Sequence, residues 1–151
     1  IALCQFDLTR CFGYPYTKDN GASLGAPLID HLVGTYENPS RSTVAQAYDF
    51  IIETLEEAVT LMSEEKNNGR MNKYAARALL ARVYLYHNDN RKAFDMAEQL
   101  IKDVDASGSY ALYPHEKYVA AWSVEAKFGS ESFFEIANSV DDTPGRDSWG
   151  Y

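Results

Sequence analysis

The chain has 151 residues, and its 22 acidic and 14 basic side chains give a formal net charge of −8. Affinity for the phosphate backbone of nucleic acids comes from clustered Lys and Arg, so we expect no nucleic-acid partner. No apolar run approaches the ~20 residues that a membrane-spanning helix requires. The composition, 46% hydrophobic and 24% charged, is typical of a folded globular domain.

The first predicted element is a helix over residues 1–12. Ile1, Cys4, Leu8 and Cys11 recur at helical spacing and predict its apolar face, and Gly13 is placed to end it. Seven helical residues separate the Cα atoms of the cysteines by ~10 Å, whereas a disulfide needs them within ~7 Å. We therefore predict two unpaired, buried thiols.

Neither end of the chain carries the capping or terminating residues expected where a domain begins or ends. A helix that begins at residue 1 has no N-cap for its first N–H groups, and residues 147–151 contain no terminating pattern. We expect the chain to be a single piece, residues 1–151, of a larger domain truncated at both ends.

Residues 13–42 are predicted to form a long loop. They contain Tyr14-Pro15-Tyr16, the turn signal Asn20-Gly21 and several further Gly and Pro residues. Loops of this length inside a compact domain are usually functional or disordered.

Three helices, over residues 44–62, 72–86 and 91–104, form a helical scaffold that we place at about 43–104. Thr43 and Gln46 form a capping box, Asn72 and Asp89 are N-caps, and Gly108 closes the region. The apolar stripes predict these inward positions: Val44, Tyr48, Ile51, Ile52, Leu55, Ala58, Val59 and Met62; Ala75, Ala76, Leu79, Leu80, Val83 and Tyr86; Ala93, Phe94, Ala97, Leu100, Ile101 and Val104.

A short turn between the second and third of these helices predicts antiparallel neighbours. Leu80-Ala81, Tyr84 and Ala93 match part of the tetratricopeptide pattern, although Ala97 stands where an aromatic residue is expected. The fold class we predict is mainly α: tetratricopeptide-like antiparallel helix pairs with long loops and one or two short strands.

The last segment, residues 105–151, is predicted to be rich in loops. Residues 110–114 read as an extended piece that ends at a proline, and residues 118–127 as a short helix. Residues 132–136 are predicted to form a short strand, and residues 138–151 a loop.

No catalytic, cofactor or metal motif occurs in the sequence. There is no phosphate-binding glycine loop, no His-Glu-x-x-His and no Cys-x-x-Cys, and the three histidines are scattered. Asp141, Asp142 and Asp147 could supply oxygen ligands to calcium, but their spacing fits no known loop. We predict a protein that is not an enzyme and has no cofactor and no metal site.

Aromatic side chains are dense outside the helical stripes. Tyr14, Tyr16, Trp122, Trp149 and Tyr151 lie in the predicted loops or short elements. An aromatic ring can stack on the C–H face of a pyranose, while polar groups at the rim take hydrogen bonds from its hydroxyls. We predict Tyr14, Tyr16, Trp149 and Tyr151 as the ligand-binding residues; the alternative is that each of these rings packs beneath a loop or against a neighbouring part of the larger domain.

Several segments of the chain together carry a resemblance to a known family. The longest is the run from Gly69 to Ile101, GRMNKYAARALLARVYLYHNDNRKAFDMAEQLI. The others are FDLTRCFGYPY (6–16), GAPL (25–28), RSTV (41–44) with YDFII (48–52) and LEEA (55–58), and ESFFEI (131–136). In this order, the set resembles the SusD/RagB family of outer-membrane nutrient-binding lipoproteins.

The resemblance implies a tetratricopeptide-like scaffold with a loop-rich ligand face. It also implies a lipid-anchored protein of the bacterial cell surface that binds oligosaccharides or other nutrients and delivers them to a SusC-like TonB-dependent transporter of the outer membrane. The membrane would be contacted only through a lipid anchor outside residues 1–151. The alternative function is a tetratricopeptide-type scaffold for protein–protein interaction that binds no small molecule.

Overall fold

The computed structural model describes residues 1–123 and 127–136 of the chain. These residues are mainly helical, as predicted, and they contain no strand. The α-helices are α1 (Ala2–Phe12), α2 (Val44–Leu61), α3 (Lys73–Tyr86) and α4 (Asn90–Ser107). Short 3₁₀ turns occur at Tyr16–Lys18, His115–Lys117 and Ala120–Trp122.

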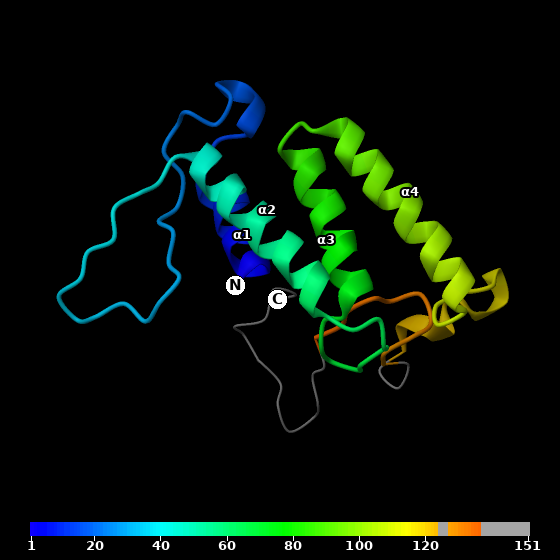
Figure 1. The fold of residues 1–151 in the computed structure, drawn as a ribbon. Helices are drawn as coiled ribbons and strands as arrows, with labels where there is room; N and C mark the ends of the chain where they lie inside the picture. Colours follow the sequence, from blue (N-terminus) through cyan, green and yellow to red (C-terminus); the bar gives the residue numbers. More distant parts are fainter. Residues whose placement is uncertain (124–126, 137–151) are drawn as a thin grey trace.

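The helices pack in chain order: α1 against α2, α2 against α3 and α3 against α4. Figure 1 shows α2, α3 and α4 side by side and alternating in direction, with α1 behind α2. The predicted antiparallel helix pairs are therefore confirmed. None of the described helices combines the length and the apolar character that crossing a membrane would require.

The core lies where α2 and α3 face each other. Val44, Ile51, Leu80 and Val83 are fully buried there, and burial of a side chain of this size stabilises the fold by about 1.5–3 kcal/mol. The buried Tyr84 hydroxyl donates a hydrogen bond of 2.7 Å to the Glu56 carboxylate, which joins α3 to α2.

The caps predicted from the sequence are present. Both halves of the Thr43–Gln46 capping box form at the start of α2, Asn72 accepts a hydrogen bond from Ala75 N–H at α3, and Asp89 caps α4. Helix α4 runs three residues further than predicted and ends at Gly108, whose φ of 63° is the left-handed conformation that favours glycine.

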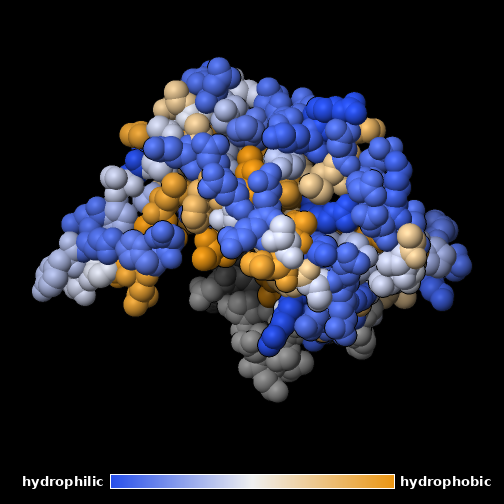
Figure 2. Space-filling model, in the orientation of Figure 1, coloured by the Kyte–Doolittle hydropathy of each residue, from blue (hydrophilic) through white to orange (hydrophobic). Residues whose placement is uncertain are grey.

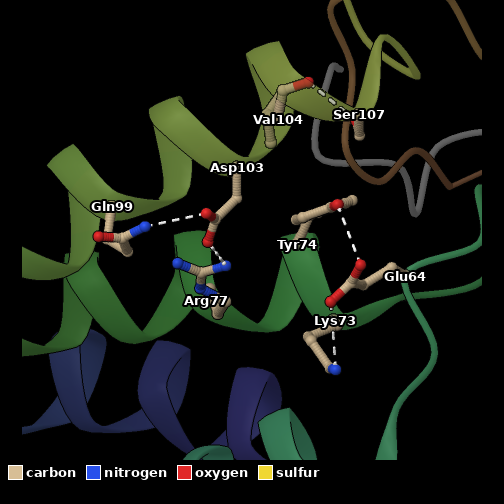
Figure 3. Close-up of polar contacts among 8 residues, drawn as sticks. All are labelled: Glu64, Lys73, Tyr74, Arg77, Gln99, Asp103, Val104 and Ser107. Atoms are coloured by element: carbon tan, nitrogen blue, oxygen red, sulfur yellow. Dashed lines mark hydrogen bonds and ion pairs between the residues drawn. The ribbon is translucent and has the colours of Figure 1, made fainter.

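A polar network also joins α3 to α4 (Figure 3). The nearly buried Arg77 donates to the Asp103 carboxylate at 2.6 Å, and Gln99 donates to the other carboxylate oxygen at 2.9 Å. These hydrogen bonds, first from Arg77 and then from Gln99, lower the pKa of Asp103. The charge of a buried guanidinium is thus compensated across the helix pair.

The predicted apolar face of α1 is wrong. Ile1, Leu8 and both cysteines are exposed, and the cysteines are free thiols. The buried residues are instead Ala2, Gln5, Phe6 and Thr9. Phe6 decides the orientation, because its ring packs edge-on against Tyr86 at 5.4 Å and Tyr48 at 6.3 Å. Figure 2 shows hydrophobic residues at the surface in the helical part of the molecule, among mostly hydrophilic neighbours.

Three other residues predicted to face inward are exposed: Tyr86, and Phe94 and Ile101 on α4. Among the described helices, α4 packs mainly against α3, so only one side of its apolar stripe is covered. Ala93, Leu100 and Val104 occupy that side. Phe94 and Ile101 are 59% and 60% exposed.

The predicted strand at residues 132–136 is also wrong. Ser132 closes the preceding turn, in which its N–H donates to the Gly129 carbonyl, and residues 133–136 are irregular. No partner strand lies beside them in the described part of the chain. Of the helix predicted over residues 118–127, the structure has the 3₁₀ turn Ala120–Trp122, and residues 124–126 are not described.

The long loop between α1 and α2 is closed at its base. Leu24 and Thr43 form an isolated antiparallel bridge, and the Arg41 guanidinium donates to the carbonyls of Gly25 and Leu24 at 2.7 and 2.9 Å. The loop projects away from the helices in Figure 1.

Candidate functional site

A pocket of about 520 Å³ lies in the segment that follows α4. Its size falls in the range of small-molecule sites, ~300–1,000 Å³. Its walls combine aromatic, aliphatic and polar side chains from two stretches of chain: Tyr113, Tyr118, Ala121, Trp122, Ser123 and Lys127, and Glu131, Ser132, Glu135 and Ile136.

Two rings of this pocket are open to solvent. Trp122 is 76% exposed and Tyr118 51%, and their ring centroids lie 6.1 Å apart in an edge-on arrangement. Neighbouring carboxylates and a serine hydroxyl provide acceptors for hydroxyl groups. This combination of stacking surfaces with polar groups can hold the apolar face of a sugar ring and the hydroxyls at its edge.

The two stretches that form the pocket are joined by hydrogen bonds. Ala111 N–H donates to the Ser130 carbonyl at 3.0 Å, and Tyr113 N–H donates to the Glu131 carboxylate at 3.1 Å. Tyr113 also packs so closely against Gly129 that a Cβ atom there would lie 1.4 Å from the tyrosine oxygen. Residue 129 must therefore be glycine for Tyr113 to hold this position.

Tyr110 fastens this segment to the helical scaffold. Its buried ring packs edge-on against Phe133 at 4.9 Å and Tyr74 of α3 at 6.0 Å. The Tyr110 oxygen accepts a hydrogen bond of 2.8 Å from the Asn72 side chain, the same residue that caps α3. The pocket is thus built on the N-terminal end of α3.

Tyr14 and Tyr16, two of the predicted ligand-binding residues, lie elsewhere. Tyr14 is 57% exposed, and the Lys18 ammonium lies 3.0 Å from its ring centroid. Tyr16 is half-buried, with Tyr48 at 5.8 Å and His87 at 4.2 Å between ring centroids. The structure therefore presents one ring to solvent and packs the other between α2 and the turn after α3.

Tyr14 and the pocket are at opposite ends of α2. Gly13 lies against Val44 at the start of α2, whereas Lys66, shortly after its end, donates hydrogen bonds to Phe128 and Gly129 beside the pocket. The 18 residues of α2 span about 27 Å. One small ligand cannot contact both places.

The other two predicted ligand-binding residues, Trp149 and Tyr151, lie outside the described residues, as do Asp141, Asp142 and Asp147. Trp122 is among the aromatic residues outside the helical stripes that the sequence identifies, whereas Tyr113 and Tyr118 were not predicted as candidate site residues. The signal available was the clustering of aromatic residues at 110–122 directly after the helical scaffold.

Across residues 1–123 and 127–136, no three His, Cys, Asp or Glu side chains come close enough together to hold a metal ion. His31 is bracketed by Asp30 at 2.7 Å and Glu37 at 2.8 Å, but each carboxylate faces a different ring nitrogen. One ion cannot bind at both nitrogens, so this trio is an ion-pair cluster.

Residues 1–85 match the sequence model of the SusD-like family described as starch-binding and associating with the outer membrane. No curated protein matches the chain.

The structure is similar to solved structures from Bacteroides. A SusD superfamily protein of Bacteroides vulgatus is 95% identical, with a TM-score of 0.93 over 100% of this chain and 34% of its own. A SusD superfamily protein of Bacteroides thetaiotaomicron is 42% identical, with a TM-score of 0.85 over 93% of this chain and 30% of its own. A SusD-like carbohydrate binding protein of Bacteroides vulgatus is 26% identical, with a TM-score of 0.74 over 94% of this chain and 30% of its own.

The chain spans about a third of the length of these solved structures. The family match covers more than half of the chain, and the fold agrees with these solved structures over 93–100% of it. The chain therefore belongs to the SusD-like family.

Proposed function

We propose that the protein binds oligosaccharides at the bacterial outer membrane without transforming them. The observation that carries this proposal is the open pocket of about 520 Å³ in which Trp122 and Tyr118 expose their rings beside carboxylate and hydroxyl groups. Membership of a family described as starch-binding supports the same chemistry. So does the relative that bears the name carbohydrate binding protein.

The finer parts of the proposal rest on the family. They are attachment to the outer membrane through a lipid, and delivery of the bound nutrient to a SusC-like TonB-dependent transporter. Tyr14, Trp149 and Tyr151 belong to the proposal as additional contacts. Tyr14 has the exposed ring that such a contact requires, at a distance from the pocket that suits a long oligosaccharide or a second molecule.

The test is isothermal titration of the complete protein with maltoheptaose, xylohexaose and mannohexaose, for the wild type and for Trp122→Ala. We expect binding of at least one of these glycans and a loss of about tenfold or more in affinity for the variant, because it removes a stacking ring. Stacking on an aromatic side chain contributes about 1–3 kcal/mol for a nucleobase, and we expect a similar contribution for a sugar ring.

The matched control is Tyr36→Ala, which removes an almost fully exposed ring from the loop between α1 and α2. This variant should bind like the wild type. If no glycan binds, the proposal fails. If Trp122→Ala binds as well as the wild type, the pocket is not the site.

A further inference from the structure

The backbone turn at residues 128–129 is held by two oppositely charged side chains. Lys66 donates to the carbonyl oxygens of Phe128 and Gly129 at 3.2 and 2.8 Å. The Glu135 carboxylate accepts hydrogen bonds from the N–H groups of the same two residues at 2.8 and 3.1 Å. All four backbone polar groups of Phe128 and Gly129 are therefore paired with Lys66 or Glu135.

Lys66 and Glu135 together form a clamp on the 128–129 turn. The clamp stabilises a backbone conformation that is unfavourable by itself. Phe128 has a φ of 56°, which costs a residue with a side chain about 1–2 kcal/mol. Such a conformation persists only where the surroundings fix it. The hydrogen bonds from Phe128 N–H and the other donors of the turn lower the pKa of Glu135, which keeps its carboxylate charged.

The clamp also determines the geometry of the pocket. Gly129 is the residue against which Tyr113 packs, and Ser130, which follows it, receives the hydrogen bond from Ala111. Glu135 itself lines the pocket. A shift of the turn would therefore move Tyr113 and Glu135 together.

Lys66 differs from Glu135 because it lies outside the pocket. It belongs to the connection between α2 and α3, where it is half-buried with its ammonium 4.9 Å from the Tyr110 ring centroid. It reaches across from the helical scaffold to a turn 62 residues later in the chain. No other side chain in the described residues bonds both carbonyls of this turn.

We propose that Lys66 is a positioning residue for the ligand pocket: by holding the 128–129 turn against the helical scaffold, it fixes Tyr113 and Glu135 in the geometry that binds the ligand. This inference rests on the proposed function. Lys66 does not contact the ligand. It changes the affinity for the ligand only by fixing the position of the 128–129 turn.

The first arm of the test compares Lys66→Met with Lys66→Arg in the complete protein, using whichever of maltoheptaose, xylohexaose and mannohexaose the wild type binds most tightly. Methionine keeps the aliphatic stem but cannot donate, so affinity should fall about tenfold. Arginine retains N–H donors for the two carbonyls and should recover most of that loss. The matched control is Lys73→Met, which removes a neighbouring lysine paired with Glu64 and should leave affinity unchanged.

The second arm separates positioning from a general loss of stability. In the Trp122→Ala background, Lys66→Met should cost little further affinity, because both changes act on the same pocket. Hydrogen exchange, which needs no ligand, should show faster exchange at the Phe128 and Gly129 amides in Lys66→Met and unchanged exchange within α2 and α3.

The outcomes distinguish the two proposals. If the wild type binds none of the three glycans, the proposed function and this inference are both overturned. If the wild type binds and Trp122→Ala does not, but Lys66→Met binds like the wild type or its exchange pattern is unchanged, only the role of Lys66 is overturned.

Discussion

Tyr14 and Tyr16 are two residues apart in the chain, yet their rings have different neighbours. The Tyr16 ring packs against Tyr48 and His87, and Gly21 approaches it so closely that a Cβ at residue 21 would lie 2.8 Å from the ring. Burial also raises the pKa of Tyr48 to about 12, which indicates an apolar environment around this cluster. Tyr16 therefore stabilises the start of α2, whereas Tyr14 is available to a ligand.

Alanine substitutions should separate these two roles. Tyr16→Ala should lower the free energy of unfolding by about 2–3 kcal/mol, since it removes a half-buried ring and leaves a cavity. Tyr14→Ala should change it by about 0.5 kcal/mol or less, as an exposed substitution. Urea unfolding followed by circular dichroism measures both, and equal losses for the two variants would contradict this assignment.

His31 is also understood at the scale of the single residue. Both of its ring nitrogens face carboxylates, of Asp30 and of Glu37, and Glu37 in addition accepts a hydrogen bond of 3.1 Å from Gly34 N–H. Both carboxylates can be satisfied only if both nitrogens carry a proton. The hydrogen bonds to Asp30 and then to Glu37 raise the pKa of His31.

This arrangement predicts that the stability of the loop between α1 and α2 depends on pH. Because the pKa is raised in the folded chain, the stabilisation is fully present below the pKa of the unfolded chain and is lost as the pH rises through the raised value. NMR titration of the His31 ring should give a pKa above the ordinary histidine value, and Glu37→Gln should lower it. A pKa of His31 at or below the ordinary histidine value in the wild type, or an unchanged pKa in Glu37→Gln, would show that the contacts of His31 with Asp30 and Glu37 do not persist in solution.

At the scale of elements, the segment from residue 110 to residue 136 depends on close packing of its two stretches. Gly129 and Gly108 provide a matched comparison, because one is confined by a side chain and the other is not. A Cβ at residue 129 would meet Tyr113, whereas a Cβ at residue 108 has no heavy atom within 4 Å.

Gly129→Ala should therefore displace Tyr113 and weaken glycan binding about tenfold or more, while the stability of the helices should change less. Gly108→Ala should cost about 1 kcal/mol of stability, because the position has a positive φ, and should leave glycan affinity unchanged. Titration calorimetry and thermal unfolding of both variants test this pair. Equal binding by Gly129→Ala and the wild type would contradict the packing described for Tyr113.

The elements also show which parts of the fold follow from sequence. Helices α2, α3 and α4 could be predicted with their caps, because Thr43, Asn72 and Asp89 act within one turn of the residues that they bond. The face that α1 buries could not be predicted, because it depends on Phe6 meeting rings of α2 and α3. For residues 132–136, β-rich composition predicted a strand, but a strand requires a partner and the structure leaves this segment irregular, with a bend at Phe133.

The candidate site shows the same division. The chemistry of sugar binding favours aromatic residues in loops, and Trp122 could be identified from the sequence for this reason. Tyr113 and Tyr118 become site residues only because the 110–113 stretch is bonded to residues 130–131, a contact between segments that no local pattern predicts. Lys66 is further removed, since its partners lie more than 60 residues later in the chain.

At the scale of the whole molecule, the helices form a row in which each contacts its neighbours in sequence. The buried residues form two hydrophobic clusters, one centred on α2 and α3 and one where α3 and α4 meet Tyr110. The outer sides of α1 and α4 stay exposed, which agrees with the exposed Leu8, Phe12, Phe94 and Ile101. The row supports loops at both ends of α2: the one that carries Tyr14 and the one that forms the aromatic pocket. Recognition in this account belongs to the loops, and the helices hold them in place.

The most direct test of glycan recognition by the aromatic pocket is a crystal structure of the complete protein with an oligosaccharide that the protein binds in solution. We predict a sugar ring stacked on Trp122 or Tyr118, with its hydroxyls hydrogen-bonded near Glu131 or Glu135, and with Lys66 still bonded to the carbonyls of Phe128 and Gly129. A pocket filled by the protein's own side chains, with the oligosaccharide bound elsewhere, would contradict it.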